Sequence, residues 1–106
     1  MMSVREATKE NFHELIKENV VVAEFFSDSC LPCQLMSKVL ENVALDMPFV
    51  SVLKVNSSKY ATLGRSFRVT AFPTILFFKN GVEVDRHIGF MSAQNIETMV
   101  GKLLYF

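Results

Sequence analysis

The sequence predicts an α/β fold, in which a central mixed β-sheet of about five strands is flanked by about four helices. Two features indicate this fold class. Short runs of β-branched and aromatic residues alternate along the chain with segments whose apolar residues recur at helical spacing. The dipeptide Asn80-Gly81, which tolerates the positive φ angles of a two-residue turn, joins the last two runs as an antiparallel hairpin.

The size and composition of the chain are those of one globular unit. Half of its 106 residues are apolar, and ten are phenylalanine. This is enough apolar material for a core that needs no disulfide or metal to stabilise it. We therefore expect a single domain over residues 1–106.

The first elements follow from capping and spacing. A short strand is predicted around Val4, and Thr8 can cap a helix whose apolar face carries Phe12, Leu15 and Ile16. The segment that follows, NVVVAEFF, has the composition of a buried strand.

The middle of the chain predicts a parallel crossover. From Cys33 to Met47 apolar residues recur at helical spacing, until a proline ends the pattern. Residues 49–56, FVSVLKVN, read as the next strand. Residues 20–56 thus form a strand-helix-strand unit long enough for a right-handed parallel connection.

The last third predicts a helix, a hairpin and a final helix. Tyr60, Leu63 and Phe67 form the inner face of a short helix, and the hairpin occupies residues 73–88. Ser92 can cap the last helix. The inner stripe of that helix consists of Ile96, Met99, Val100, Leu103 and Leu104.

Charge and hydropathy argue against several partners. Eleven basic and eleven acidic side chains cancel, so no electrostatic footprint for nucleic acid or an anionic membrane is expected. The longest apolar runs are too short to cross a bilayer, and the N-terminal residues lack the apolar core of a signal peptide. We expect a cytoplasmic protein with no membrane partner, and no sequence feature indicates an oligomer.

Cys30 and Cys33 are the only cysteines, and they are three residues apart. In a reducing compartment a structural disulfide is not expected, and a cross-link closing so short a loop would add little stability. A close cysteine pair there is redox-active or binds a metal. Zinc would need two more ligands, and His13 and His87 do not have ligand spacing to another candidate, so no metal site is expected.

The position of the pair suits reversible disulfide chemistry. Cys30 falls in the loop after the buried strand and Cys33 in the first helical turn, where Pro32 is tolerated. Three-residue spacing puts both sulfurs on one helix face, and the helix N-terminus favours a thiolate. Cys30 is expected to be accessible and Cys33 more shielded.

Four segments resemble the thioredoxin family. AEFFSDSCLPC resembles its active-site segment, and KVN at 54–56 the end of its next strand. TAFPTILFFKNG resembles its proline loop, strand and hairpin turn, and HIG at 87–89 its last active-site loop. The resemblance covers essentially the whole chain without gaps. It implies a thioredoxin-like fold.

The resemblance also implies roles for four residues of the reaction. Cys30 matches the attacking thiolate and Cys33 the resolving thiol. Glu24 matches a buried acid, usually aspartate, that helps to move the proton of the second cysteine, and Lys54 matches a lysine near that acid.

For Glu24 the residues themselves leave two interpretations. A charge in the middle of VVAEFF is costly to bury unless it is paired or protonated. Burial would favour the neutral carboxyl and a nearby Lys54 the charged one, so that the group could accept a proton near neutral pH. Alternatively, Glu24 points to solvent at a strand edge.

The remaining residues implied by the resemblance bind substrate. Pro73 matches a cis-proline that faces the disulfide. With it, the groove for an extended substrate segment would be lined by Leu31, Pro32, Phe72, Ile88 and Gly89.

Some positions depart from the family pattern, in which the active site commonly reads Trp-Cys-Gly-Pro-Cys. Ser29 replaces the tryptophan and Leu31 the glycine, while Lys38 stands where many members have a helix-kinking proline. Ala71 and Phe72 stand where glycine and isoleucine are usual. These changes leave the reacting groups in place but bear on redox potential, partners and docking of a reductase.

The predicted function is reduction of protein disulfides by dithiol exchange. No cofactor is expected beyond the Cys30–Cys33 disulfide, with electrons from an NADPH-dependent enzyme such as thioredoxin reductase or an equivalent. Two alternatives use the same fold: an oxidase or isomerase of higher potential, and a docking module. The presence of both cysteines argues against the module.

Overall fold

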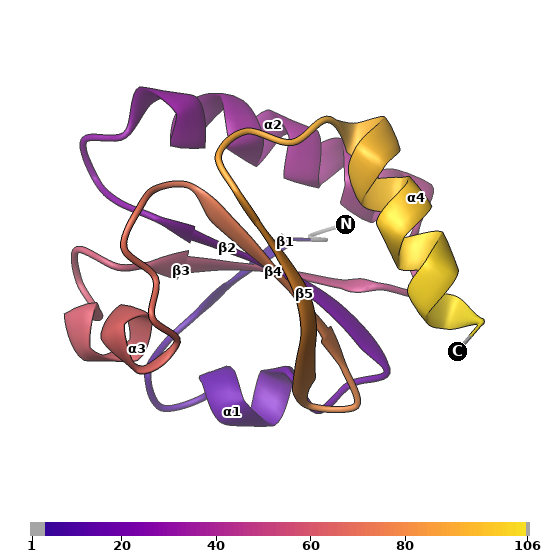
Figure 1. Cartoon of the computed structure of the whole chain (residues 1–106), viewed down its shortest axis with the longest axis horizontal. Helices are drawn as coiled ribbons and strands as arrows, with labels where there is room; N and C mark the ends of the chain where they lie inside the picture. Colours follow the sequence, from indigo (N-terminus) through magenta and orange to yellow (C-terminus); the bar gives the residue numbers. More distant parts are fainter. Residues whose placement is uncertain (1–3, 106) are drawn as a thin grey trace.

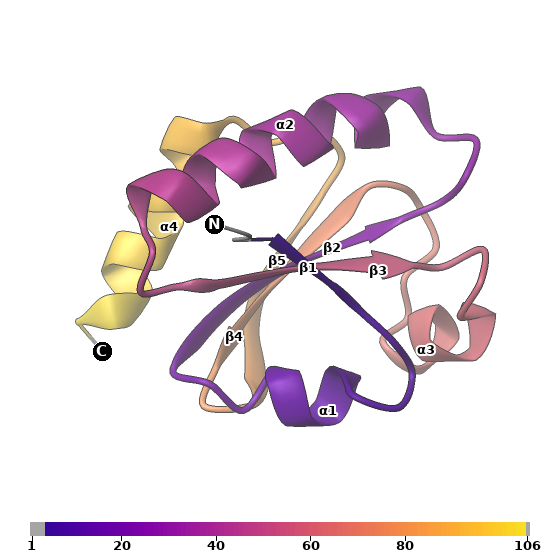
Figure 2. The ribbon, with the colours of Figure 1, turned by 180° about the vertical axis from the view of Figure 1, so that it is seen from behind.

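A computed structural model describes residues 4–105 as a mixed sheet with helices on both of its faces. The elements in chain order are β1 (Val4–Ala7), α1 (Phe12–Leu15), β2 (Val20–Phe26), α2 (Leu31–Asp46), β3 (Ser51–Asn56), α3 (Ala61–Ser66), β4 (Thr74–Lys79), β5 (Val82–Ile88) and α4 (Ala93–Leu104). Figures 1 and 2 show α2 and α4 over one face of the sheet and α1 and α3 over the other. The predicted α/β class is confirmed.

The five strands lie in the order β1-β3-β2-β4-β5. β3 pairs in parallel with both β1 and β2, while β4 pairs antiparallel with β2 and β5. The β2-α2-β3 unit is therefore the expected parallel crossover. The hairpin is also confirmed, because Asn80 and Gly81 have φ angles of 52° and 85°.

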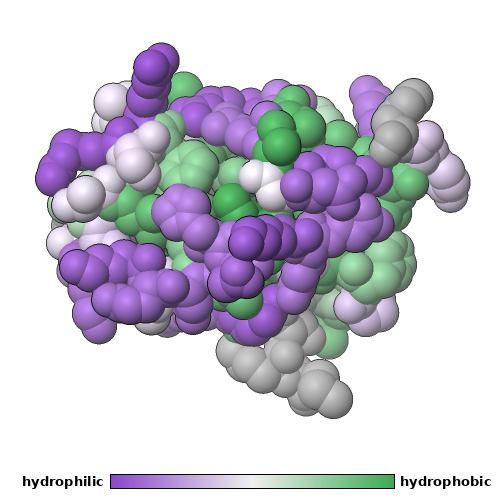
Figure 3. Space-filling model, turned by 90° about the horizontal axis from the view of Figure 1, so that it is seen from below, coloured by the Kyte–Doolittle hydropathy of each residue, from purple (hydrophilic) through white to green (hydrophobic). Residues whose placement is uncertain are grey.

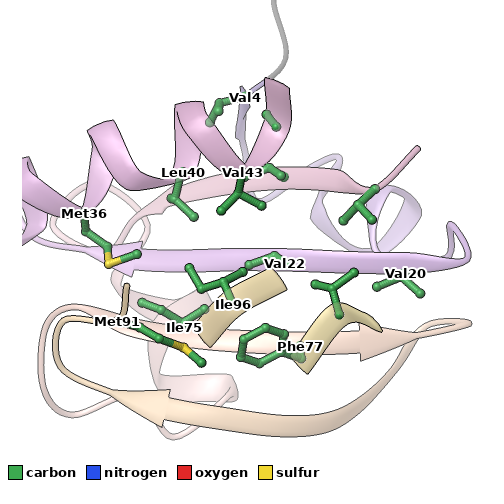
Figure 4. Packing of buried hydrophobic residues seen from close by; sticks show 14 residues of the cluster. Val4, Val20, Val22, Met36, Leu40, Val43, Ile75, Phe77, Met91 and Ile96 are labelled. Carbon is green, nitrogen blue, oxygen red and sulfur yellow. The ribbon is translucent and has the colours of Figure 1, made fainter. Parts of the chain in front are cut away.

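Side chains of the central strands alternate between two cores, since successive strand residues point to opposite faces. The core under α2 and α4 takes Val20 and Val22 of β2, together with Met36 of α2 and Phe77 of β4, as Figure 4 shows. The core under α1 and α3 takes Val21, Ala23, Phe25, Leu53, Val55, Leu76 and Phe78, with Phe12 from α1. The alternation places residue 24 on the α2 face.

Of the two predicted helix N-caps, Ser92 is confirmed and Thr8 is not. Ser92 caps α4 as predicted, because its Oγ accepts the Asn95 N–H at 3.1 Å. The prediction that Thr8 caps the first helix is wrong: α1 is a single turn whose N-cap is Asn11. Thr8 and Asn11 instead exchange side chain–backbone hydrogen bonds of 2.7 and 3.2 Å, which close a separate turn before the helix.

Two further observations concern the surface. Within residues 4–105, no helix is long and apolar enough to cross a membrane. The face that lies at the bottom of Figure 1, over α1 and α3, is covered mostly by hydrophilic side chains with apolar ones scattered between them (Figure 3).

Candidate active site

The two cysteines lie at the N-terminus of α2 and are joined by a disulfide. Cys30 is the N-cap residue, and its Sγ accepts the Cys33 N–H at 3.2 Å. The two Cα atoms are 5.2 Å apart, which is ordinary spacing for a bridged pair. One turn of helix therefore brings both sulfurs together, and the pair can open and close without rearrangement of the fold.

The two sulfurs differ in exposure in the expected way. Cys30 is half-buried, whereas only 3% of Cys33 is exposed. The unpaired N–H groups and the dipole at the start of this sixteen-residue helix stabilise negative charge on sulfur. A thiolate on Cys30 would thus be both stabilised and accessible.

Glu24 is fully buried on the α2 face of the sheet. The solvent-facing alternative is wrong, since residue 24 belongs to the central strand β2 with β3 and β4 on its two sides. Among the described residues neither carboxyl oxygen has a hydrogen-bond partner. Burial raises the pKa of Glu24 from 4.5 to about 7, against an opposing effect of the Lys54 charge.

Lys54 is the neighbour of Glu24 in the parallel pairing of β2 and β3. Its Nζ donates a 2.6 Å hydrogen bond to Ser37 Oγ and lies 4.8 Å from the centre of the Phe26 ring. Ser37 in turn donates to the Cys33 carbonyl at 3.3 Å. Lys54 is thereby connected to the backbone of the disulfide turn.

The proline loop meets the end of β5 beside the sheet. The Phe72-Pro73 bond is cis and Pro73 is buried. Gly89 donates its N–H to the Pro73 carbonyl at 2.7 Å. Thr74, the first residue of β4, donates its hydroxyl to the Ala71 carbonyl at 2.7 Å, which closes the loop from the other side.

Strand register places the predicted substrate residues at one end of the sheet. Thr74 pairs with Phe25 near the end of β2 and with Ile88 at the end of β5. The chain leaves β2 at this end to reach Cys30. Leu31 and Ile88 are 69% and 63% exposed. Phe90 and Pro32 are also exposed, whereas Phe72 is half-buried against the core under α1 and α3.

A small polar cleft of about 130 Å³ flanks the disulfide. It is lined by Phe26, Ser27, Asp28, Cys30, Cys33, Gln34, Ser37 and Lys54. Lys54 and Ser37 therefore border the same hollow as the two sulfurs. Glu24 does not reach it.

Neither histidine lies in a metal-binding arrangement. His13 stacks near Phe12 and Phe67, and His87 Nε2 is 3.0 Å from the Phe90 carbonyl. Within residues 4–105, no group of three or more His, Cys, Asp or Glu side chains is placed to bind an ion.

Ser37 is the site residue that sequence reasoning missed. It follows Cys33 by four residues, and this spacing on a helix could have placed it on the same face. A serine within a helix is unremarkable by itself, however. Its contact with Lys54 depends on how α2 packs over β3.

Comparison with known proteins agrees with this geometry. The thioredoxin family model matches residues 3–102. The chain is 31% identical over 99 residues to a thioredoxin of Chlamydia trachomatis serovar D, in an alignment that covers 93% of this chain and 97% of that protein. It is 30% identical, over the same length and with the same coverage, to a thioredoxin of Chlamydia pneumoniae.

A crystal structure of chloroplastic thioredoxin z superposes with a TM-score of 0.90 at 26% identity, covering 100% of this chain and 98% of that one. Fold, cysteine spacing and relatives thus agree. The chain belongs to the thioredoxin family and is a dithiol-disulfide oxidoreductase that acts on protein disulfides through a redox-active cysteine pair.

Proposed function

We propose that this protein reduces protein disulfides, with Cys30 as the attacking thiolate and Cys33 as the resolving thiol. The observation that carries the assignment is the difference between the two sulfurs. Cys30 lies at the helix N-cap and is partly accessible, whereas Cys33 is buried next to it at bonding distance. A bulky partner can approach the first sulfur, and the second is placed to attack the bond that forms.

The exchange proceeds in two balanced steps. In the first, the Cys30 thiolate attacks one sulfur of the target disulfide; the new mixed disulfide forms as the target's other sulfur leaves as a thiolate. In the second, Cys33 loses its proton and attacks Cys30, which releases the second target thiolate and closes the Cys30–Cys33 bond. Two electrons pass to the target, whose thiolates take up two protons.

Glu24 is proposed as the acceptor of the Cys33 proton. A carboxyl with a pKa of about 7 is matched to proton transfer near neutral pH. Its burial on the sheet face that α2 and α4 cover supports this role, and its lack of a hydrogen-bond partner among the described residues leaves both oxygens open to a proton. Lys54 limits the rise of the Glu24 pKa by its charge.

The substrate is proposed to lie as an extended segment beside the disulfide. Pro73 and Gly89 would line its backbone path, and the apolar side chains of Leu31, Phe72 and Ile88 would receive its side chains. The exposure of Leu31 and Ile88 supports this assignment, because large apolar groups on a surface commonly mark an interaction site. Pro32, next to Cys30, would complete the path.

The cellular setting follows from the direction of the reaction. We infer a reducing, cytoplasmic setting in which an NADPH-dependent enzyme, thioredoxin reductase or an equivalent, returns Cys30 and Cys33 to the dithiol. We further infer that residues 1–106 act as one domain and as a monomer, so that the apolar surface around Cys30 is free to receive its partners.

Trapping of a mixed disulfide tests the roles of the two cysteines. With a Cys33→Ser variant, a disulfide-bonded peptide should remain attached to Cys30, detectable by mass spectrometry and released by dithiothreitol. Cys30→Ser should abolish insulin reduction and trap nothing. Persistent insulin reduction by Cys30→Ser would refute the assignment of Cys30 as the nucleophile.

A further inference from the structure

Lys54 and Glu24 are neighbours in the sheet but are not hydrogen-bonded to each other. The parallel register pairs the two residues directly, and a lysine there could approach the carboxyl. Instead, both Glu24 oxygens are without a partner among the described residues, and the Lys54 ammonium bonds to Ser37 at 2.6 Å. A buried carboxyl beside an available cation would ordinarily attract it.

Ser37 fixes the position of the Lys54 ammonium through hydrogen bonds. Its hydroxyl accepts a hydrogen bond from Lys54 and donates one to the Cys33 carbonyl at 3.3 Å. Because the hydroxyl proton is used toward Cys33, the oxygen is left as an acceptor for the ammonium. The Phe26 ring adds a second attraction, with its centre 4.8 Å from Nζ. The ammonium is therefore held between α2 and β2.

Among the described residues, Lys54 is the charged group that acts on the pKa of Glu24, and Asp28 borders the cleft that Lys54 and Ser37 also line. On β4 the neighbour of Glu24 is Ile75, and α4 faces this core with Ile96 and Val100. At the start of α2 lie Cys33 and its N-cap Cys30, whose sulfurs are joined in the disulfide and do not titrate in the oxidised protein. The position of one ammonium thus decides how well the carboxylate is stabilised.

We propose that Ser37 is a positioning residue that holds the Lys54 ammonium away from the Glu24 carboxyl and so keeps Glu24 an effective proton acceptor for Cys33. The role rests on the proposed function of Glu24 in the reaction. A direct ion pair would stabilise the carboxylate and lower the pKa of Glu24, which makes it a weaker base. The Ser37 bond prevents this while leaving the Lys54 charge close by.

The test measures the pKa of Glu24 directly, by carbon NMR of its carboxyl in the oxidised protein. In Ser37→Ala the ammonium loses its acceptor, and the Glu24 pKa should fall by about one pH unit as the ion pair forms. Ser37→Thr keeps a hydroxyl on the same helix position and should retain the parent pKa. Alanine is a better helix former than serine, so the fold of Ser37→Ala is expected to be intact.

A Lys54→Met background shows whether the effect passes through the lysine. There Ser37→Ala should leave the Glu24 pKa unchanged, because no ammonium remains to be released. An unchanged or raised Glu24 pKa in Ser37→Ala alone, or an equal fall in the Lys54→Met background, would overturn the proposal.

The NMR titration needs no turnover, which separates this proposal from the proposed reaction. The pH profile of insulin reduction should shift to lower pH in Ser37→Ala, in parallel with the Glu24 pKa. If the pKa falls and the pH profile does not move, the positioning role of Ser37 stands and the catalytic role of Glu24 is wrong.

Discussion

Gly89 donates its backbone N–H to the carbonyl of Pro73 at 2.7 Å, and this bond ties the loop after β5 to the proline loop. Gly89 adopts a φ of 98°, a conformation that other residues rarely take. The two loops border the end of the sheet from which the chain runs to Cys30. The conformation of Gly89 and its hydrogen bond to Pro73 therefore help to shape the path proposed for a substrate backbone.

Gly89→Ala should lower the free energy of unfolding by about 1–2 kcal/mol and weaken substrate binding, because an L-residue is strained at this φ. An added Cβ meets no atom within 4 Å, so the backbone and not crowding would be responsible. Denaturant unfolding and the KM for a disulfide peptide check this. Gly101→Ala is the matched control: in the α4 helix it should raise stability by up to about 1 kcal/mol and leave the KM unchanged. A loss of stability in both variants would contradict the explanation.

Glu24→Gln should remove a pH dependence of stability. Because burial raises the pKa of Glu24 to about 7, the folded protein binds a proton that the unfolded chain releases near 4.5. The free energy of unfolding should therefore fall by roughly 3 kcal/mol as the pH rises from about 4.5 to 7. Above pH 7 it should stay level. Denaturant titrations of the oxidised protein at several pH values measure this slope.

In Glu24→Gln most of this slope should be lost, and the variant should be more stable than the parent above pH 7 while reducing insulin more slowly. Glu41→Gln, an exposed carboxyl on α2, serves as the control and should keep the parent slope. A parent protein whose stability does not change over this pH range would show that the Glu24 pKa is not raised.

Arg86→Lys should destabilise the fold by about 1–2 kcal/mol. The guanidinium bonds both oxygens of Glu83, at 2.6 and 2.9 Å, and also the Phe67 carbonyl just after α3 at 2.8 Å. An ammonium cannot reproduce this fork. Thermal unfolding should show a lower Tm for Arg86→Lys. Arg65→Lys should hardly change the Tm, because the Arg65 side chain makes one long hydrogen bond on the exposed surface of α3.

The double change Ser29→Trp with Leu31→Gly should raise turnover with thioredoxin reductase more than turnover with a chemical dithiol. Leu31 is 69% exposed next to Cys30, so its side chain lies outside the core and is open to contact with a docking partner. Initial rates with each donor, at matched protein concentration, give the comparison. Equal gains with both donors would place the effect in the chemistry of the couple instead of in docking.

Local sequence patterns were enough to predict the order and type of the elements, the Asn80-Gly81 hairpin, the Ser92 cap and the position of Cys30 and Cys33 at the start of a helix. Each of these depends on interactions among residues close along the chain, so spacing and residue type carry them. Thr8 shows the limit of this reasoning. It was predicted to cap the first helix, but it forms hydrogen bonds with Asn11 that close a turn before that helix begins.

The burial of Glu24 and the hydrogen bond of Lys54 to Ser37, in contrast, depend on contacts between segments far apart in the chain. A charge in an apolar run is compatible with a buried or an exposed position, and Glu24 is buried because β2 lies between β3 and β4 with α2 and α4 covering that face of the sheet. Ser37 and Lys54 meet although 17 residues separate them. Such contacts depend on how helices pack across a sheet, and no local pattern in the chain encodes that distance.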